Sequence, residues 1–188
     1  MKKDQMKLAR LVVAAAFATL LPHSVKAQDD ERRTRVDTTV RLDRGGTVDL
    51  SLISGKIRVT GWDRPDVKIV ASIESGLLRF DANSSRVSLS VDQSEDSRGR
   101  SRHDVGDARY EVSVPRGSRL VLEAVSGDIT ATGSPGELEA ASVRGDAEVA
   151  GGNREGRVET GSGSAHADPT NVDVRPETGR AAAAEGTV

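Results

Sequence analysis

The chain has 188 residues, no cysteine, one tryptophan, one tyrosine and two phenylalanines, and its formal net charge is −2. Without residues 1–27, a leader described next, 22 basic and 28 acidic residues remain, a net charge of −6. This balance argues against a nucleic-acid binder, which usually carries a basic face, and the few aromatic residues argue against stacking platforms for single strands or sugars. The absence of cysteine also means that no disulfide supports the fold.

Residues 1–27 have the features of a secretory signal peptide. Basic residues precede an apolar run from Leu11 to Leu21, about eleven residues long, which is too short to span a bilayer as a helix. Val25 and Ala27 occupy positions −3 and −1 of a cleavage site, so we expect cleavage near Ala27; a retained N-terminal anchor is the alternative. The leader predicts a periplasmic, cell-surface or secreted protein with no transmembrane segment in the mature chain.

Residues 28–35 are predicted to form a polar linker, and residues 36–118 an N-terminal β region. Alternating apolar and polar residues, separated by turns rich in glycine and proline, are typical of strands. A charged stretch rich in glycine and serine, residues 92–107, is predicted to be a loop or a disordered excursion. We expect strands at residues 36–42, 47–53, 56–60, 67–73, 86–91 and 109–114.

A short phrase recurs in the second half of the chain. Gly127, Gly145 and Gly163 are spaced by eighteen residues, each inside a small polar turn such as "SGD" or "RGD". Apolar residues alternate on either side of each glycine, as in strands with one buried face, and glycine supplies the positive φ that a sharp corner requires. The same spacing aligns two further columns, Glu123 with Ala141, Glu159 and Glu177, and Ala124 with Ser142, Thr160 and Thr178.

This spacing predicts a parallel β-solenoid over residues 119–180, a coil resembling a single-stranded β-helix with about 18 residues per rung. An irregular β cap or a sandwich-like N-terminal half would precede it, so the protein is predicted to be all-β. A left-handed hexapeptide helix also uses about 18 residues per turn, but it would turn Glu137 and Glu155 inward. Residues 181–188 are expected to be an irregular or truncated tail, because alanine stands where the next turn glycine is expected.

One early phrase, "SGKIRVTG" around Gly55, stands apart from the other copies. It precedes Gly127 by 72 residues, and no intervening copies are visible, so we interpret this multiple of eighteen as accidental. Together with the leader, the junction "YEVSVPRGSRLVLEAVSGDI" and the repeated turns, the phrase resembles the exported bacterial proteins known as putative adhesins of β-strand-repeat type, a family of unknown function. The resemblance covers most of residues 47–168 and implies a β-solenoid in the periplasm or on the surface, with no established chemistry.

The candidate site residues are structural turn residues. Gly55, Gly127, Asp128, Gly145, Asp146 and Gly163 are all explained by turn formation, and we predict no catalytic, cofactor-binding or metal-binding residue among them. Two sharper hypotheses involve the same turns. Arg144-Gly145-Asp146 spells an integrin-binding tripeptide, and stacking would bring the carboxylates of Asp128 and Asp146 about 4.8 Å apart, where a calcium ion could sit between them.

Two further clusters invite a catalytic or binding interpretation. Ser162, Ser164, His166 and Asp168 contain the residue types of a hydrolase, but they lie along one short segment without a nucleophile elbow. His103 lies among balanced charges in the polar loop, where a solvated loop is the simplest interpretation. We therefore expect no cofactor and no catalytic triad.

These features predict an exported, non-enzymatic structural or adhesin-like surface at the bacterial cell envelope, with an unidentified envelope or surface partner. The alternatives are a binding module for envelope polysaccharide and a carbohydrate-active β-helix enzyme of lyase type. An uncapped strand edge at the end of the coil would also permit end-to-end or edge association. Ile129 and Val149 are expected to face inward, and an acidic, dispersed outer face is expected at Glu123, Thr130, Glu139, Glu148 and Glu159.

Overall fold

The computed structural model describes residues 31–92, 105–133, 136–151, 156–168, 172–176 and 181–183, and these residues form strands and turns without a helix. The all-β prediction is therefore confirmed. The predicted signal peptide, His103, Glu177 and Thr178 lie outside the described residues. The strands are β1 (Glu31–Arg33), β2 (Arg35–Arg41), β3 (Thr47–Trp62), β4 (Asp66–Ile73), β5 (Leu77–Ala82), β6 (Arg86–Asp92), β7 (Ala108–Pro115), β8 (Arg119–Thr132), β9 (Glu137–Arg144), β10 (Ala147–Ala150), β11 (Gly156–Ser162), β12 (Ala165–Asp168), β13 (Val172–Pro176) and β14 (Ala181–Ala183).

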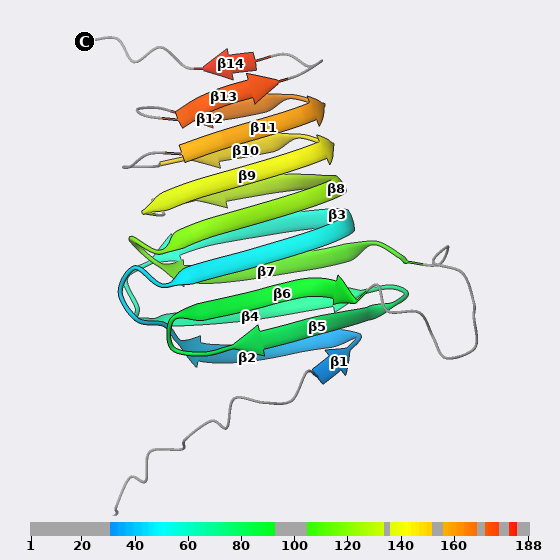
Figure 1. The fold of residues 1–188 in the computed structure, drawn as a ribbon, viewed down its shortest axis with the longest axis vertical. Coiled ribbons are helices and arrows are strands. Elements are labelled where there is room, and N and C mark those ends of the chain that lie inside the picture. Colours follow the sequence, from blue (N-terminus) through cyan, green and yellow to red (C-terminus); the bar gives the residue numbers. More distant parts are fainter. Residues whose placement is uncertain are drawn as a thin grey trace, which may run out of the picture.

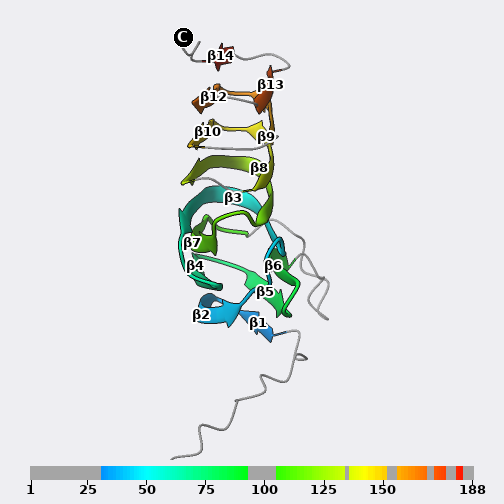
Figure 2. The same cartoon turned by 90° about the vertical axis from the view of Figure 1, so that its left-hand side faces the viewer.

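The strands belong to one open mixed sheet that bends, so that two layers face each other (Figures 1 and 2). The long strands β3 and β8 contribute their first halves to one layer and their second halves to the other. The first layer has the order β1-β5-β6-β3-β8-β9-β11-β13, and the second layer has the order β2-β4-β7-β3-β8-β10-β12-β14.

The core lies between the layers and is built by strict alternation. In β7, for example, Tyr110, Val112 and Val114 are buried while the residues between them face outward. The buried side chains become smaller toward the C-terminal strands, because leucine and isoleucine in β3 and β8 give way to alanine and valine. Among these, the predicted inward residues Ile129 and Val149 are each 1% exposed, which confirms their assignment.

Residues that are eighteen positions apart in the repeated segment pair directly in neighbouring strands. Arg119 pairs with Glu137 and Ala147 with Ala165 in parallel register, each eighteen residues on. The last unit is shorter, because Glu159 pairs with Arg175 and Ala165 pairs with Ala181, both sixteen residues on. The predicted alignment of Glu159 with Glu177 and of Thr160 with Thr178 is therefore wrong by two residues. Residues 181–183, predicted to be irregular, form β14 in this shifted register.

The early phrase is not an isolated copy. Gly55 pairs directly with Gly127, and Lys56 pairs with Asp128, so residues 72 apart in sequence are neighbours in the sheet. The interpretation of this distance as accidental is therefore wrong: the chain between them folds into the other half of the protein and returns to the same register. Consequently the predicted boundary between residues 118 and 119 interrupts neither the sheet nor the core.

The remaining differences from the predicted strands are local. The strands predicted at 47–53 and 56–60 are one continuous strand, β3, because the corner at Gly55 does not interrupt the pairing. Strand β1 lies inside the predicted linker, and β5 was not predicted. In the described residues, no helix is long or apolar enough to cross a membrane.

Candidate functional site

The predicted turn glycines form one column at the corner between the layers. Gly55, Gly145 and Gly163 have φ values of 124°, 134° and 155°, as a corner glycine should. Gly127 does not have a positive φ, so the expectation of a positive φ in every copy is wrong at this position.

Close backbone approach explains why glycine nevertheless stands in every copy. A Cβ atom added to Gly127 would lie 2.6 Å from the carbonyl oxygen of Gly55. The same atom on Gly145 would lie 2.3 Å from the carbonyl oxygen of Gly127, and on Gly163 it would lie 2.1 Å from that of Gly145. Each unit therefore needs glycine at this position, because any side chain would prevent it from stacking against the preceding unit. The buried Ser142 adds a further tie, because its hydroxyl donates to the carbonyl of Gly127 at 3.0 Å.

The aspartates beside these glycines connect successive units. The backbone N–H of Asp146 donates to Oδ1 of Asp128 at 3.3 Å, and the N–H of Ser164 donates to Oδ1 of Asp146 at 2.8 Å. Nζ of Lys56 lies 3.2 Å from Oδ2 of Asp128 and supplies the opposite charge. The described residues contain no cluster of three or more acidic, histidine or cysteine side chains that could hold a metal. The aspartates therefore act here as acceptors for the neighbouring backbone.

Among the residues that the structure describes, Ser162, Ser164 and His166 show no convergence of reactive groups, and the cluster around His103 lies outside those residues. His166 is exposed and pairs in register with Glu148, while the hydroxyl of Ser162 donates to the backbone carbonyl of Val143 at 3.4 Å. The side chain of Asp168 lies outside the described residues. Arg144 and Asp146 of the "RGD" turn are exposed, but one carboxylate oxygen of Asp146 already accepts the hydrogen bond from Ser164.

A polar hollow of about 610 Å³ lies beside the glycine column on the second layer. Two of the acidic side chains that line it already have partners. Asp128 forms an ion pair with Lys56, and Asp107 accepts a 2.5 Å hydrogen bond from the hydroxyl of Ser54. Arg109 and Arg144 also line the hollow, and neither guanidinium has an ion-pair partner among the described residues. Within the described part of the chain, this hollow therefore offers two cations without an ion-pair partner on a mixed-charge surface.

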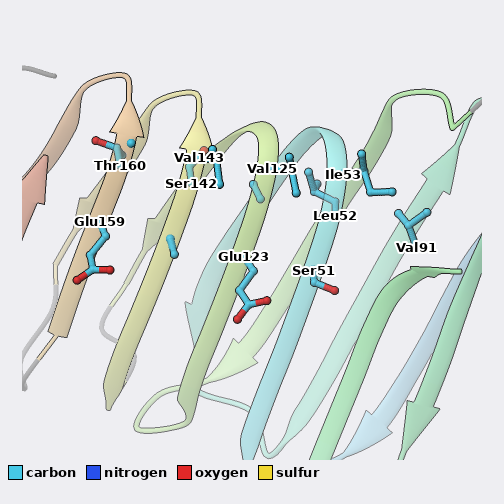
Figure 3. Close-up of a pocket in the computed structure, with 13 residues that line it drawn as sticks. Ser51, Leu52, Ile53, Val91, Glu123, Val125, Ser142, Val143, Glu159 and Thr160 are labelled. Atoms are coloured by element: carbon cyan, nitrogen blue, oxygen red, sulfur yellow. The ribbon is translucent and has the colours of Figure 1, made fainter. Parts of the chain in front are cut away.

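A second groove, of about 640 Å³, lies on the outer face of the first layer near the corner (Figure 3). Its upper edge in the figure is a column of apolar side chains, Ile53, Val125 and Val143, on neighbouring strands β3, β8 and β9. Val125 is 50% exposed and Val143 is 57% exposed, unusually high values for β-branched apolar side chains. Ile53 is half-buried and packs against the core, so the exposed apolar surface of the column is that of Val125 and Val143. Exposed apolar side chains with polar residues beside them are typical of an interaction site.

The polar side of the groove is acidic. Glu123 and Glu159 lie in one row with Ser51 (Figure 3). Nε of Arg157 lies 3.3 Å from a carboxylate oxygen of Glu159, whereas Glu123 has no such partner among the described residues.

The predicted outer face divides between the two layers. Glu123, Glu139 and Glu159 lie on the first layer, while Thr130 and Glu148 lie on the second, so they do not form one surface. Sequence reasoning also missed the apolar column. The alternation of side chains along a strand does indicate this column. The inward residues Leu120, Leu122 and Ala124 have even numbers, so the odd-numbered Val125, and Val143 eighteen residues later, must point outward.

No family model and no curated protein matches the chain. Similar solved structures are a putative cell adhesion protein from Clostridium sporogenes (14% identity, covering 77% of this chain and 74% of that one, TM-score 0.47) and a putative adhesin from Bacteroides fragilis (13% identity, 79% and 95% covered, TM-score 0.26). A putative adhesin from Parabacteroides merdae is 9% identical, with 81% and 97% of the two chains covered and a TM-score of 0.29. Two of these three solved proteins are described as putative adhesins and one as a putative cell adhesion protein.

Proposed function

We propose that this protein is an exported, non-enzymatic β-solenoid that acts as a structural or adhesin-like interaction surface at the bacterial cell envelope. The observation that carries the proposal is the apolar column on a regular strand face, in which Val125 and Val143 are exposed while Ile53 is half-buried and packs against the core. A soluble protein gains no stability from leaving such side chains in water, so a partner that covers them would recover their hydrophobic free energy.

The solenoid part of the proposal rests on the parallel register. From β8 to β12, successive units pair at an eighteen-residue offset in both layers, the last unit pairs at sixteen, and the corner glycines touch in one column. A unit of this kind cannot bury its apolar residues alone and is stabilised by its neighbours. The leader, with cleavage near Ala27, supports export to the periplasm or the surface.

The non-enzymatic part rests on how the polar groups are used. Asp128, Asp146 and Ser162 bond to the backbone of neighbouring units, and Glu159 pairs with Arg157. Groups engaged in this way stabilise the stack of strands and are not arranged around a common point where a substrate bond could be broken.

Capture from envelope fractions tests this function. The full chain is immobilised and compared with the double variant Val125→Asp/Val143→Asp, which charges the apolar column without touching the core. We expect the wild-type chain to retain an envelope component that the double variant loses, while Thr130→Lys on the second layer retains it. If both variants retain the same components, or if the wild-type chain retains none, the proposal is wrong.

A binding module for envelope polysaccharide is the second candidate, and the polar hollow favours it. Arg109 and Arg144 offer guanidinium groups that suit the carboxylate or phosphate groups of an acidic polysaccharide. Calorimetric titration with an acidic polysaccharide should give binding that weakens with salt and is lost in Arg109→Ala/Arg144→Ala. Binding that is unchanged in this double variant would exclude the hollow as the site.

A further inference from the structure

The outer face of the first layer carries three rows of side chains that cross β3, β8, β9 and β11 in that order. The residues of each row lie side by side because the four strands are in parallel register. We name the rows by their β3 residue. The Ile53 row is Ile53, Val125, Val143 and Gly161; the Ser51 row is Ser51, Glu123, Ala141 and Glu159; the Asp49 row is Asp49, Val121, Glu139 and Arg157.

We propose that a second copy of this chain covers this face, related by a two-fold axis that runs along the strands between β8 and β9. The inference rests on the proposed function, since it names the partner of the same apolar column. Under this symmetry β8 faces the partner's β9, and β3 faces the partner's β11. Each contact then occurs twice, as an isologous interface requires.

The Ile53 row is self-complementary in shape under this axis. Val125 faces the partner's Val143, so the two most exposed apolar side chains of the face cover each other. Ile53, the largest side chain of the row, faces the partner's Gly161, which has no side chain and leaves room for it. The apolar column is thereby removed from water along its whole length.

In the other two rows one pair joins opposite charges, and the partner's Glu139 faces Val121. Glu123 faces the partner's Ala141, and Ser51, a hydrogen-bond donor, faces the partner's Glu159. Asp49 faces the partner's Arg157, a pair of opposite charges. Arg119 and Glu137, which form an ion pair of 3.2 Å within one chain, face each other again across the axis. Like charges oppose each other in none of these pairs.

Neighbouring positions of the axis fail on charge. An axis through β8 places Glu123 opposite the same residue of the partner. An axis through β9 places Glu139 opposite itself and Glu123 opposite the partner's Glu159. Like charges directly opposite each other disfavour association, so the charge pattern disfavours an axis along either strand. The axis between β8 and β9 is preferred over one between other strands because it places the exposed Val125 and Val143 opposite each other.

The size of the face sets the expected strength. Four strands about 4.8 Å apart and four outward positions about 6.8 Å apart cover roughly 500 Å² on each copy. The total of about 1,000 Å² is at the lower end of specific interfaces, so the dimer is expected to be weak and reversible.

Sedimentation velocity over a concentration series tests the dimer and its register with the full chain. Val125→Lys and Val143→Glu should each remain monomeric at concentrations where the wild-type chain dimerises. Mixing the two variants should restore a dimer, because the new lysine at position 125 then faces the new glutamate at position 143 while the unaltered valines cover each other. Both positions are exposed, and an unchanged melting temperature confirms that the variants fold. Thr130→Lys, on the second layer, should dimerise like the wild-type chain.

A wild-type chain that stays monomeric up to about millimolar concentration overturns the proposal, because interfaces of this size associate within that range. A dimer that both variants keep, or a mixture of variants that stays monomeric, overturns it as well, because either result places the contact elsewhere. The envelope capture described above separates the two proposals. If capture depends on Val125 and Val143 but the chain is monomeric, the dimer proposal is wrong and the proposed function is retained.

Discussion

The hydroxyl of Tyr110 donates a 3.1 Å hydrogen bond to the backbone carbonyl of Ser51 across the core. Tyr110 belongs to the second layer through β7, and Ser51 belongs to the first layer through β3. The bond therefore ties the two layers together at the place where the N-terminal half meets the first repeated phrase.

Burial makes this tie sensitive to alkaline pH. Desolvation raises the pKa of Tyr110 well above its ordinary value of about 10, because the buried tyrosinate would lack water. Above pH 10 the unfolded chain releases the phenol proton while the folded chain retains it, so stability should fall by up to about 1.4 kcal/mol per pH unit. Urea unfolding at several pH values, followed by the fluorescence of the single tryptophan, measures this slope.

Tyr110→Phe is the matched control for that slope. It should cost about 1 kcal/mol at neutral pH through the lost hydrogen bond, and it should remove the part of the alkaline slope that Tyr110 contributes. An identical slope in the variant would show that other groups control the alkaline response. Since Tyr110 is the only tyrosine in the chain, tyrosinate absorbance reports its ionisation directly.

A series of glycine-to-alanine substitutions should separate backbone strain from lack of space. Gly117 has a φ of 84° and open space around it, so Gly117→Ala should cost about 1 kcal/mol from strain alone. Gly127→Ala meets the Gly55 carbonyl without positive φ and should cost about 1–3 kcal/mol from the clash. Gly145→Ala combines both effects and should be the most destabilising. Thermal and urea unfolding measure the order, and a Gly127→Ala variant as stable as wild type would refute the close packing of the column.

The inward and outward assignment predicts a sharp contrast between adjacent residues. Ile129→Asp buries a charge without a partner and should cost about 4 kcal/mol or more, enough to unfold a marginally stable domain. Val149→Asp should behave in the same way. Thr130→Lys, on the outward side of the same strand as Ile129, should change stability by less than about 0.5 kcal/mol. Circular dichroism checks all three, and equal effects at positions 129 and 130 would contradict the assignment.

The aspartates at the corner should stabilise the stack without a metal. Asp146→Ala removes the acceptor for the N–H of Ser164 and should lower stability by up to about 1 kcal/mol, whereas Asp146→Asn keeps an acceptor oxygen and should lose less. Calcium should leave the melting temperature of the wild-type chain unchanged, since a ligand of the folded state would raise it. A calcium-dependent rise that disappears in Asp146→Ala would establish a metal site and overturn this interpretation.

Much of the local structure follows from the period of the sequence. Residues 109–114 alternate strictly between apolar and polar residues, and residues 67–73 do so except at Val70; they form β7 and β4 with boundaries moved by at most one residue. The short β1, with the sequence "ERR", lacks this alternation, and in β5 it covers only the five residues from Leu78 to Ala82; neither strand was predicted. Their position depends on antiparallel pairing with each other and with β6, which is a tertiary effect.

Long-range register is the part that the sequence alone could not supply. Eighteen-residue offsets are visible where copies follow one another, but the pairing of Gly55 with Gly127 spans a segment without copies. The last unit is two residues shorter than the others. In the sequence a glycine stands sixteen residues after Gly163, at Gly179, but the eighteen-residue period of the preceding copies points to Ala181. The exposed valine column was readable from parity, but the groove beside it exists only because β3 lies against β8.

The contact between β3 and β8 also determines the order in which the molecule can fold. A segment of 72 residues must close before the two strands meet, whereas each later unit docks on a neighbour only sixteen or eighteen residues away. The first closure therefore costs more conformational entropy than each later one. Folding should therefore wait at this first docking step and then proceed quickly by local addition toward the C-terminus. Until that step is complete, one edge of β3 has no partner strand, and this is the stage at which the chain is most exposed to aggregation and to proteases.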